Sequence, residues 1–306
     1  MATEGQKEKR GTAEKYVEYK LEKPLEETIL YDKPEYNIAR ITFNRPEKHN
    51  AWFYPEMDDW LLTLMRRAID DDDVKVIIFR GNGPSFCVGD DLNRAPAEAY
   101  GLRPHQKLDQ MHRLRGFRRI YETWKNILYC PKNTIAQVHG WAIAGGWIYV
   151  ELCDLAIAAE SAKFSQYEQR IGFGGMTSLL SMLHFGPKRA RELMLTGGTL
   201  TAQKAKEWGL VNAVVPDDKL EEETMHWAKM ICLNSADGLF NSKMLMQLNY
   251  EALGFGTANQ AMSMAHTLFT NLVWHEDEQN FLRLRTQVGA REAFRQREAR
   301  YAELGF

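Results

Sequence analysis

An apolar stretch that ends in two adjacent glycines, from His139 to Ile148, constrains the fold of this chain more than any other feature. Its first half has the composition of a buried strand, and the residues after Gly145 and Gly146 have that of a helix. Glycine has no Cβ, so a ligand can approach the main chain there, and the first N–H groups of a helix lack intrahelical partners. A helix start of this kind favours negative charge. The stretch therefore predicts either a site for a polarised oxygen or a tight turn that requires glycine only for its shape.

The segments around this stretch alternate between strand and helix patterns. Apolar and polar residues alternate over 37–44, and the pattern stops at Pro46, which lacks the N–H that a strand ladder requires. Segment 74–81 is β-branched and almost continuously apolar, as expected for a buried strand. Further strands are predicted at 134–138 and 155–159, and helices at 55–69, at 104–128 and from Gly146 onward. Strand, helix and strand in this order predict an α/β layer.

The chain after Phe164 is predicted to be mostly helical. Helices are expected at 177–185, 188–195, 202–208, 217–234, 237–250, 257–274 and 276–298, with one short strand at 211–215. The first residues of the chain are rich in lysine and glutamate and have no apolar core. These patterns divide the chain into a charged arm at 1–25, an α/β core at 26–216 and a helical C-terminal region at 217–306.

The composition argues against several kinds of binding partner and metal site. A formal net charge of −2 gives no global reason to expect nucleic acid. The four cysteines form no C-x-x-C pair, so neither a zinc site nor a disulfide framework is predicted. No apolar run approaches the roughly twenty residues of a membrane span, and the N-terminus lacks the apolar core of a secretory signal. We therefore expect a cytoplasmic protein without a metal site and without a nucleic-acid or membrane partner.

Five segments resemble, in order and spacing, the crotonase superfamily, which is also called the enoyl-CoA hydratase/isomerase superfamily. They are 41–51 (ITFNRPEKHNA), 86–92 (FCVGDDL), 139–156, 162–168 (AKFSQYE) and 192–212. Each segment is weak alone, but together they cover about residues 35 to 215. The resemblance implies an α/β fold, a crotonase-like spiral of β-β-α turns with a helical C-terminal region. It also implies a homotrimer or dimer of trimers and chemistry on acyl-CoA thioesters, so coenzyme A enters with the substrate and no separate cofactor is expected.

The chemistry shared by this superfamily is the stabilisation of an enolate by two backbone N–H groups. By position, the resemblance assigns one donor to the N–H of Asp90, directly after Gly89, and the other to the N–H of Gly145. The enolate oxygen is more basic than the thioester oxygen, so both hydrogen bonds strengthen as the reaction proceeds. The carboxylate at position 90 departs from the small or apolar residue common in the family, and its charge is unfavourable beside an oxyanion unless it points away.

The acid/base residue implied by the resemblance is Glu168. Familiar hydratases hold a water molecule between two glutamates, of which Glu168 matches one, whereas Ile148 occupies the position of the other. Glu151, about one helical turn further along, is a candidate replacement. Met176 stands where related 4-chlorobenzoyl-CoA dehalogenases and dienoyl-CoA isomerases have a catalytic aspartate, so neither of those two reactions is expected.

Hydration of an α,β-unsaturated acyl-CoA, with or without lyase activity, is the first functional hypothesis. Trp141 and the lack of a carboxylate at position 148 resemble the hydroxycinnamoyl-CoA hydratase-lyases, which favours an aromatic or alicyclic acyl group. Double-bond isomerisation needs only one carboxylate and is the second hypothesis. A CoA hydrolase that acts in ring cleavage and a CoA-binding scaffold without turnover are the remaining alternatives.

Further residues are expected around the substrate. The loop that meets the adenine and pantetheine of coenzyme A in the family is matched by Lys48, His49, Asn50 and Ala51, with Asp91 and Leu92 near it. For Asp91, a role in capping the loop is equally consistent with the sequence. The residues expected near the acyl group are Trp141, Trp147, Ile148 and Phe173, although at least half of the aromatic residues in this region are assigned to packing. Arg283, Arg285, Arg291 and Arg295 are expected in solvent or at a coenzyme phosphate, and the arginines of 104–128 in a lid or a subunit interface.

Overall fold

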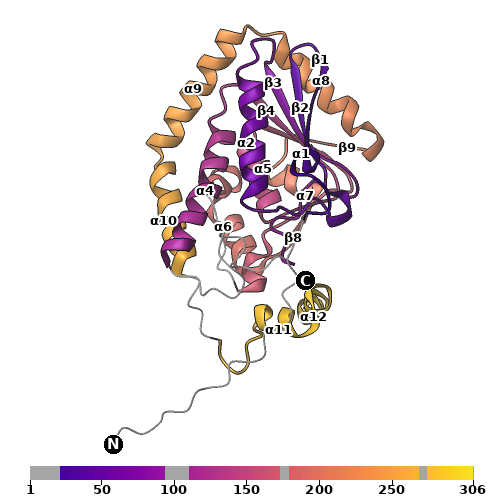
Figure 1. The fold of residues 1–306 in the computed structure, drawn as a ribbon, viewed down its shortest axis with the longest axis vertical. Coiled ribbons are helices and arrows are strands. Elements are labelled where there is room, and N and C mark those ends of the chain that lie inside the picture. The colour runs from indigo at the N-terminus through magenta and orange to yellow at the C-terminus, as the bar shows by residue number, and fades with distance from the viewer. Residues whose placement is uncertain (1–20, 94–109, 173–178, 269–273, 306) are drawn as a thin grey trace, which may run out of the picture.

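A six-stranded sheet forms the centre of the protein, in the order β1-β2-β3-β4-β6-β9 (Figure 1). The computed structural model describes residues 21–93, 110–172, 179–268 and 274–305. Apart from the antiparallel pair β1 and β2, all neighbouring strands of this sheet are parallel. The strands are β1 (Ile29–Glu35), β2 (Ile38–Phe43), β3 (Val76–Gly81), β4 (Asn133–Val138), β6 (Leu155–Ala159) and β9 (Ala213–Val215). The prediction of an α/β fold is confirmed.

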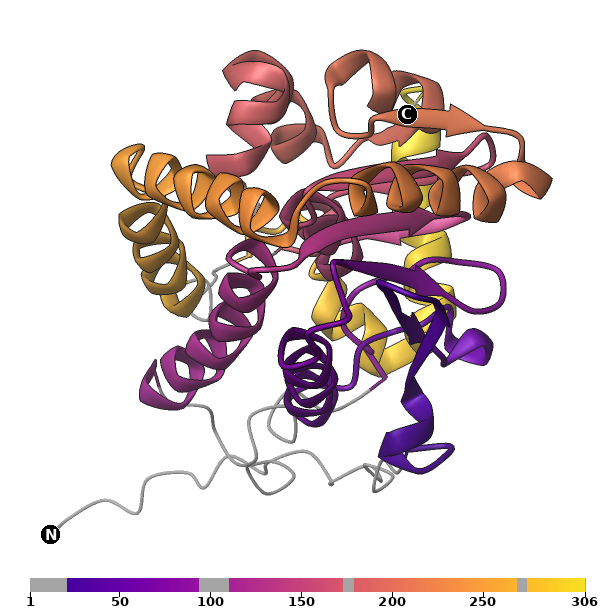
Figure 2. The ribbon, with the colours of Figure 1, turned by 90° about the horizontal axis from the view of Figure 1, so that it is seen from above.

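Both faces of this sheet are covered, which explains the continuous apolar run in β3. Successive side chains of a strand point to opposite faces. Val76 and Ile78 belong to one apolar cluster with α8 (Leu220–Cys232), and Ile77 and Phe79 belong to the other with α2 (Glu56–Ile69). Figure 2, which views the molecule from above, shows α8 against the sheet. The strand predicted from 74–81 is therefore buried on both sides, as its sequence indicates.

A second sheet of three short strands positions the residues of the opening glycine stretch. It has the order β5-β7-β8, with β5 (Trp141–Ile143) parallel to β7 (Lys163–Ser165) and β7 antiparallel to β8 (Thr199–Thr201). The helix α5 (Gly145–Leu152) begins directly after β5. Because Ile143 pairs with Ser165, the start of α5 lies beside the segment that follows β7.

The C-terminal half is helical, as predicted, with one correction. The helices are α6 (Leu179–Thr196), α7 (Ala202–Trp208), α8, α9 (Ala236–Ala252), α10 (Phe255–Leu268), α11 (Phe281–Val288) and α12 (Ala290–Ala302). The prediction of one helix over 276–298 is wrong, because Gly289 has a φ of 82° and separates α11 from α12. The break predicted between 185 and 188 is confirmed by the non-helical Gly186, which precedes Pro187 within α6.

Several elements fall outside the sequence predictions or outside the described residues. The short helix α1 (Leu25–Thr28) and the strands β1 and β8 were not predicted, because none of them carries a periodic apolar pattern of useful length. Helix α4 (Gln110–Leu128) is described from Gln110, so the predicted start at 104 and residues 1–20 of the predicted arm lie outside the described residues. None of the helices in the described ranges combines the length and the apolar character that a membrane crossing requires.

Candidate active site

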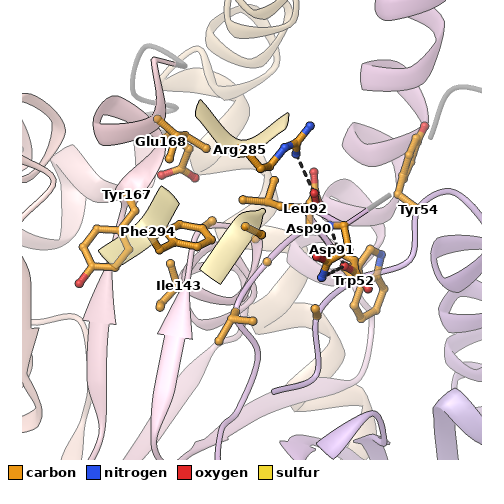
Figure 3. Close-up of a pocket in the computed structure, with 18 of the residues that line it drawn as sticks. Trp52, Tyr54, Asp90, Asp91, Leu92, Ile143, Tyr167, Glu168, Arg285 and Phe294 are labelled. Carbon is orange, nitrogen blue, oxygen red and sulfur yellow. Dashed lines mark hydrogen bonds between the residues drawn. The ribbon is translucent and has the colours of Figure 1, made fainter. Parts of the chain in front are cut away.

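A cavity of about 1190 Å³ brings most of the predicted site residues together. Of those residues, its lining includes Lys48, His49, Ala51, Asp90, Asp91, Leu92, Trp141, Gly145, Ile148 and Glu168. Figure 3 shows Glu168 and Tyr167 on one side of this cavity and Asp90, Asp91 and Trp52 on the other. Segments that are far apart in the sequence therefore line one cavity.

The loop after β3 presents the N–H of Asp90 to the cavity. The N–H of Trp52 donates to the carbonyl of Gly89 at 2.7 Å, and the N–H of Asp91 donates to the carbonyl of Trp52 at 2.9 Å. Since extended residues alternate the direction of their polar groups, the intervening Asp90 directs its own N–H away from Trp52. Within the described residues, no acceptor is bonded to the N–H of Asp90. This donor is available to a ligand.

The N–H of Gly145 lies at the start of α5, where the backbone is strained. Ala144 has φ 52° and ψ −117°, a conformation that is costly for a residue with a side chain and typical of functional sites. Its N–H donates to the carbonyl of Ser165, and its carbonyl accepts from the N–H of Ile148 at 3.1 Å, which closes the first turn of the helix. No described residue accepts a hydrogen bond from the N–H of Gly145. A second free donor thus lies at the cavity wall.

The two glycines of the pair serve different purposes. A Cβ on Gly146 would lie 2.1 Å from the carbonyl oxygen of Cys87, so packing requires glycine there. A Cβ on Gly145 would meet nothing closer than the Cα of Gly89, at 3.6 Å, and Gly145 has no left-handed φ. The turn therefore does not require glycine at position 145, and the lack of a Cβ there leaves room for a ligand beside its N–H. The contact with Gly89 also places the N–H of Gly145 next to the loop that carries the N–H of Asp90.

Glu168 lies in a short 3-10 helix (Tyr167–Ile171) that follows β7. Its Oε2 atom is buried without a hydrogen-bond partner among the described residues, and its carboxyl accepts a bond from its own N–H. Burial and, to a smaller extent, the nearby charges of Asp90 and Glu151 raise the pKa of Glu168 to about 7. A carboxyl with this pKa can both give and take a proton near neutral pH.

The helix α5 contributes no carboxyl to the cavity. Ile148 is buried and lines the cavity at the position where the familiar hydratases have their other glutamate. Glu151 is 2% exposed, accepts a hydrogen bond from the hydroxyl of Ser181 and is not part of the cavity lining. The hypothesis that Glu151 replaces the missing carboxylate is therefore not supported.

The neighbouring acids Asp90 and Asp91 differ in their contacts. Asp91 is buried, forms an ion pair with the fully buried Arg45 at 3.0 Å and accepts the N–H of Asn93 at 3.1 Å. Arg45 also bonds Glu22 at 3.0 Å and the carbonyl of Ala51. Asp91 is thus a structural residue that closes the loop, which agrees with the capping interpretation. The carboxyl of Asp90 instead faces the cavity, and burial of the position raises its pKa to about 6.

Two of the predicted substrate-contacting residues have structural roles instead. Asn50 is fully buried and donates from its amide to the carbonyls of Asn82, Ser85 and Phe86, so it holds the loop together and does not line the cavity. Trp147 is also fully buried and packs edge-to-face against Phe164 and Phe185 in the core. The predicted Phe173 and the Met176 position lie outside the described residues.

An aromatic wall of the cavity was not predicted from the sequence. It consists of Trp52, Tyr54, Phe117, Trp124 and Tyr149, with Ile120 and Ile148 beside them. Asp58 of α2 is part of this wall; it accepts the indole N–H of Trp52 at 3.1 Å, and burial raises its pKa to about 7. The residues lie on three separate segments, so no local pattern in the sequence could have grouped them.

The C-terminal helices α11 and α12 close another side of the cavity. Arg285 donates to the carbonyl of Leu92 at 2.7 Å, and Arg283 also lines the cavity, whereas Arg295 bonds Glu292 on the surface. Phe294 and Arg297 of α12 reach the same space, and the guanidinium of Arg297 lies 5.0 Å from the ring centre of Tyr167. In the ranges that the structure describes, no group of three or more His, Cys, Asp and Glu side chains is placed to hold a metal ion.

Known proteins resemble this chain in sequence and in fold. A family model described as enoyl-CoA hydratase/isomerase matches residues 33–286. A crystal structure of a probable enoyl-CoA hydratase from Mycobacterium smegmatis shares 33% identity over 79% of this chain and 93% of that chain, with a TM-score of 0.71. A crystal structure of an enoyl-CoA hydratase/isomerase from Xanthobacter autotrophicus Py2 shares 31% identity over 89% of this chain and 98% of that chain, with a TM-score of 0.79.

Proposed function

Because the chain belongs to the enoyl-CoA hydratase/isomerase family, we propose that it hydrates an α,β-unsaturated acyl-CoA whose acyl group carries a ring. One observation carries the proposal: two backbone N–H groups that have no partner among the described residues, at Asp90 and Gly145, share a cavity with the carboxyl of Glu168. Two adjacent donors suit an oxygen that gains negative charge, and a carboxyl with a pKa of about 7 suits proton transfer. An enolate formed from a thioester requires both the pair of N–H donors and a group that transfers the proton.

In the proposed reaction the thioester oxygen accepts hydrogen bonds from the N–H groups of Asp90 and Gly145. Addition of water to the β-carbon moves the electrons of the double bond onto this oxygen, where the two donors hold the resulting enolate. Glu168 then gives its proton to the α-carbon, and the proton that the added water loses restores the protonated carboxyl. The donors are fixed in advance by the strand contacts of Gly89 and by the strained Ala144, so they need no reorganisation as the charge develops.

Coenzyme A would enter as part of the substrate, and the proposal requires no separate cofactor. The side of the cavity that carries Lys48, His49, Arg283 and Arg285 supplies positive or polar groups suited to phosphates and adenine. The aromatic wall suits a bulky apolar acyl group better than a short chain.

We expect a ring-bearing substrate such as cinnamoyl-CoA or cyclohex-1-enecarbonyl-CoA to have a kcat/KM at least about tenfold above that of crotonyl-CoA. Burial of several additional ring carbons against the wall of Trp52, Tyr54, Phe117 and Trp124 is the physical reason, since each apolar carbon contributes about 1 kcal/mol or more. Initial rates with the three thioesters measure the ratio. A preference for crotonyl-CoA would contradict the ring-bearing substrate.

Double-bond isomerisation is the second candidate, because the apolar Ile148 leaves α5 without a carboxyl at the cavity. The same assay in deuterated water separates the two reactions by mass spectrometry. Hydration adds the mass of one D₂O molecule to the thioester, whereas isomerisation introduces deuterium without adding oxygen. The first result supports the proposed hydration, and the second would replace it with isomerisation.

We also propose that the chain forms a homotrimer or a dimer of trimers. Helix α9 has no buried residue, and its exposed side chains include Phe240, Met244, Leu245 and Leu248. A helix of this composition is rarely left in water. Light scattering coupled to size exclusion is expected to give three or six chain masses, and replacement of Leu245 and Leu248 by glutamate is expected to reduce that mass. A monomeric wild type would contradict the proposal.

A further inference from the structure

The carboxyl of Asp90 has no structural role in the loop that it belongs to. Its neighbour Asp91 is paired with Arg45, whereas no described residue forms a hydrogen bond or an ion pair with the side chain of Asp90. The side chain is exposed, and the residue lines the cavity. A carboxyl that lines a cavity without a structural partner can contact a substrate there.

Asp90 lies between the other functional groups of the site. Its own N–H is one of the two oxyanion donors, and the Cα of Gly89 is 3.6 Å from the position of a Cβ on Gly145, the second donor. The charge of Asp90 is near enough to Glu168 to add to the burial that raises the pKa of Glu168. In Figure 3 the two carboxyls approach the cavity from different elements. A thioester held by the two N–H groups would therefore have a carboxyl on either side of its reacting carbons.

Other described carboxyls near this space are already engaged. Glu151 is bonded to Ser181 away from the cavity, and Asp58 is held in the aromatic wall by the indole of Trp52 and the hydroxyl of Thr123. Position 148 holds isoleucine. Glu298, which also lines the cavity, is paired with Arg170 and Arg297. Asp90 is thus the described carboxyl that could act together with Glu168 on one substrate.

We propose that Asp90 is the second catalytic carboxyl of this site and that it activates the water that adds to the β-carbon. The proposal rests on the function proposed above and deepens it. Asp90 takes a proton from water as the water oxygen bonds to the β-carbon, and the electron pair of the double bond moves to the thioester oxygen. Glu168 then gives its proton to the α-carbon, and a proton passed from Asp90 to Glu168 restores the pair. One H and one OH are added, and no other reactant is needed.

Both carboxyls can exchange a proton near neutral pH. Desolvation raises the pKa of Glu168 and the pKa of Asp90 above their usual range. A pair of such carboxyls is suited to opposite roles as acid and base. The charge of Asp90 repels an enolate, but it disappears when Asp90 takes the proton. The repulsion therefore weakens as the oxyanion forms, which favours the transition state over the ground state.

The test compares two reactions of the full-length enzyme. Hydration of cinnamoyl-CoA requires both carboxyls, whereas exchange of the α-hydrogens of 3-phenylpropanoyl-CoA in deuterated water requires only Glu168 and the two N–H groups. In Asp90→Asn we expect hydration to fall by about 10² to 10⁴ and α-exchange to fall far less, so that the ratio of hydration to exchange drops by at least about tenfold. Asp90→Glu is expected to recover part of the hydration rate.

Two outcomes would overturn the role of Asp90 while leaving the proposed function intact. One is hydration by Asp90→Asn at a rate near that of wild type. The other is an equal loss of hydration and α-exchange in Asp90→Asn, because that would mean the substitution distorts the oxyanion donors. If the wild-type enzyme itself neither hydrates an enoyl-CoA nor exchanges α-hydrogens, the proposed function is wrong and the role of Asp90 fails with it.

Discussion

Replacement of Glu168 by glutamine is expected to lower kcat by about 10³ and to change KM far less. Glutamine keeps the size and shape of the side chain but can neither release nor accept a proton at neutral pH. The Oε2 atom of Glu168 has no partner among the described residues, and the amide oxygen of glutamine can still accept the bond from the residue's own N–H. Steady-state kinetics with the best thioester substrate measure the loss. An unchanged kcat would exclude Glu168 as the principal proton carrier.

The pH dependence of the wild-type enzyme provides an independent check on Glu168. A general acid acts in its protonated form, so a group with a pKa raised to about 7 supports the reaction below that pH and loses this ability as the pH rises through 7. The rate is therefore expected to decline above about pH 7, and this decline should be absent from the residual activity of Glu168→Gln. The variant Glu168→Asp is the matched control, because it keeps the ionisable group and shortens the side chain by one carbon.

Much of the fold was predictable because its strands are long and strongly patterned. Val76 to Phe79 are apolar at successive positions, and the sheet indeed places them alternately against α8 and α2. The break between α11 and α12 was missed because Gly289 lies between two helical sequences, and a single glycine within a helical pattern does not by itself end a helix. Strand β8 has three residues, which is too short for a period of two to be recognised.

The backbone part of the site was also predictable, whereas the side-chain part was only partly so. A glycine pair at a strand end and a glycine before Asp90 are local signals, and both Asp90 and Gly145 line the cavity. Trp147 and Ile148 are adjacent in a helix whose residues from Gly146 to Leu152 are all buried. The sequence has no amphipathic pattern there that would show which side chain faces the core. It therefore could not predict that Trp147 lies in the core and Ile148 lines the cavity.

The remaining site residues were not predicted correctly because their roles depend on contacts between segments that are distant in the sequence. Arg297 approaches Tyr167 from a helix near the C-terminus, and Asp58 meets Trp52 and Thr123 through packing of α2 against α4. Asn50 was predicted to face the substrate because it lies beside Lys48 and His49, but its amide satisfies three buried carbonyls and directs it inward. Backbone polar groups that are buried must be paired, and this need fixes the role of Asn50.

Replacement of Gly145 by alanine is expected to separate stability from activity. The added Cβ would have only one close protein contact, with the Cα of Gly89 at 3.6 Å, and alanine favours a helix over glycine by about 1 kcal/mol. The folded state should therefore be as stable as wild type or slightly more so. The methyl group would lie beside the two oxyanion donors, where it would displace the thioester oxygen, so kcat/KM should fall by about 10² to 10³. Thermal unfolding and steady-state kinetics on the same preparation measure both effects.

Gly146→Ala is the contrasting variant, because its Cβ would lie 2.1 Å from the carbonyl oxygen of Cys87. It is expected to unfold at a lower temperature, and any loss of its activity would follow from the loss of folded protein. If Gly145→Ala is instead destabilised like Gly146→Ala, position 145 is glycine for the shape of the turn. If Gly145→Ala is stable and fully active, the thioester oxygen does not approach this N–H, and the oxyanion site must be sought elsewhere in the cavity. If Gly145→Ala is as stable as wild type but has lost activity, the glycine at position 145 serves ligand binding and is not needed for the fold.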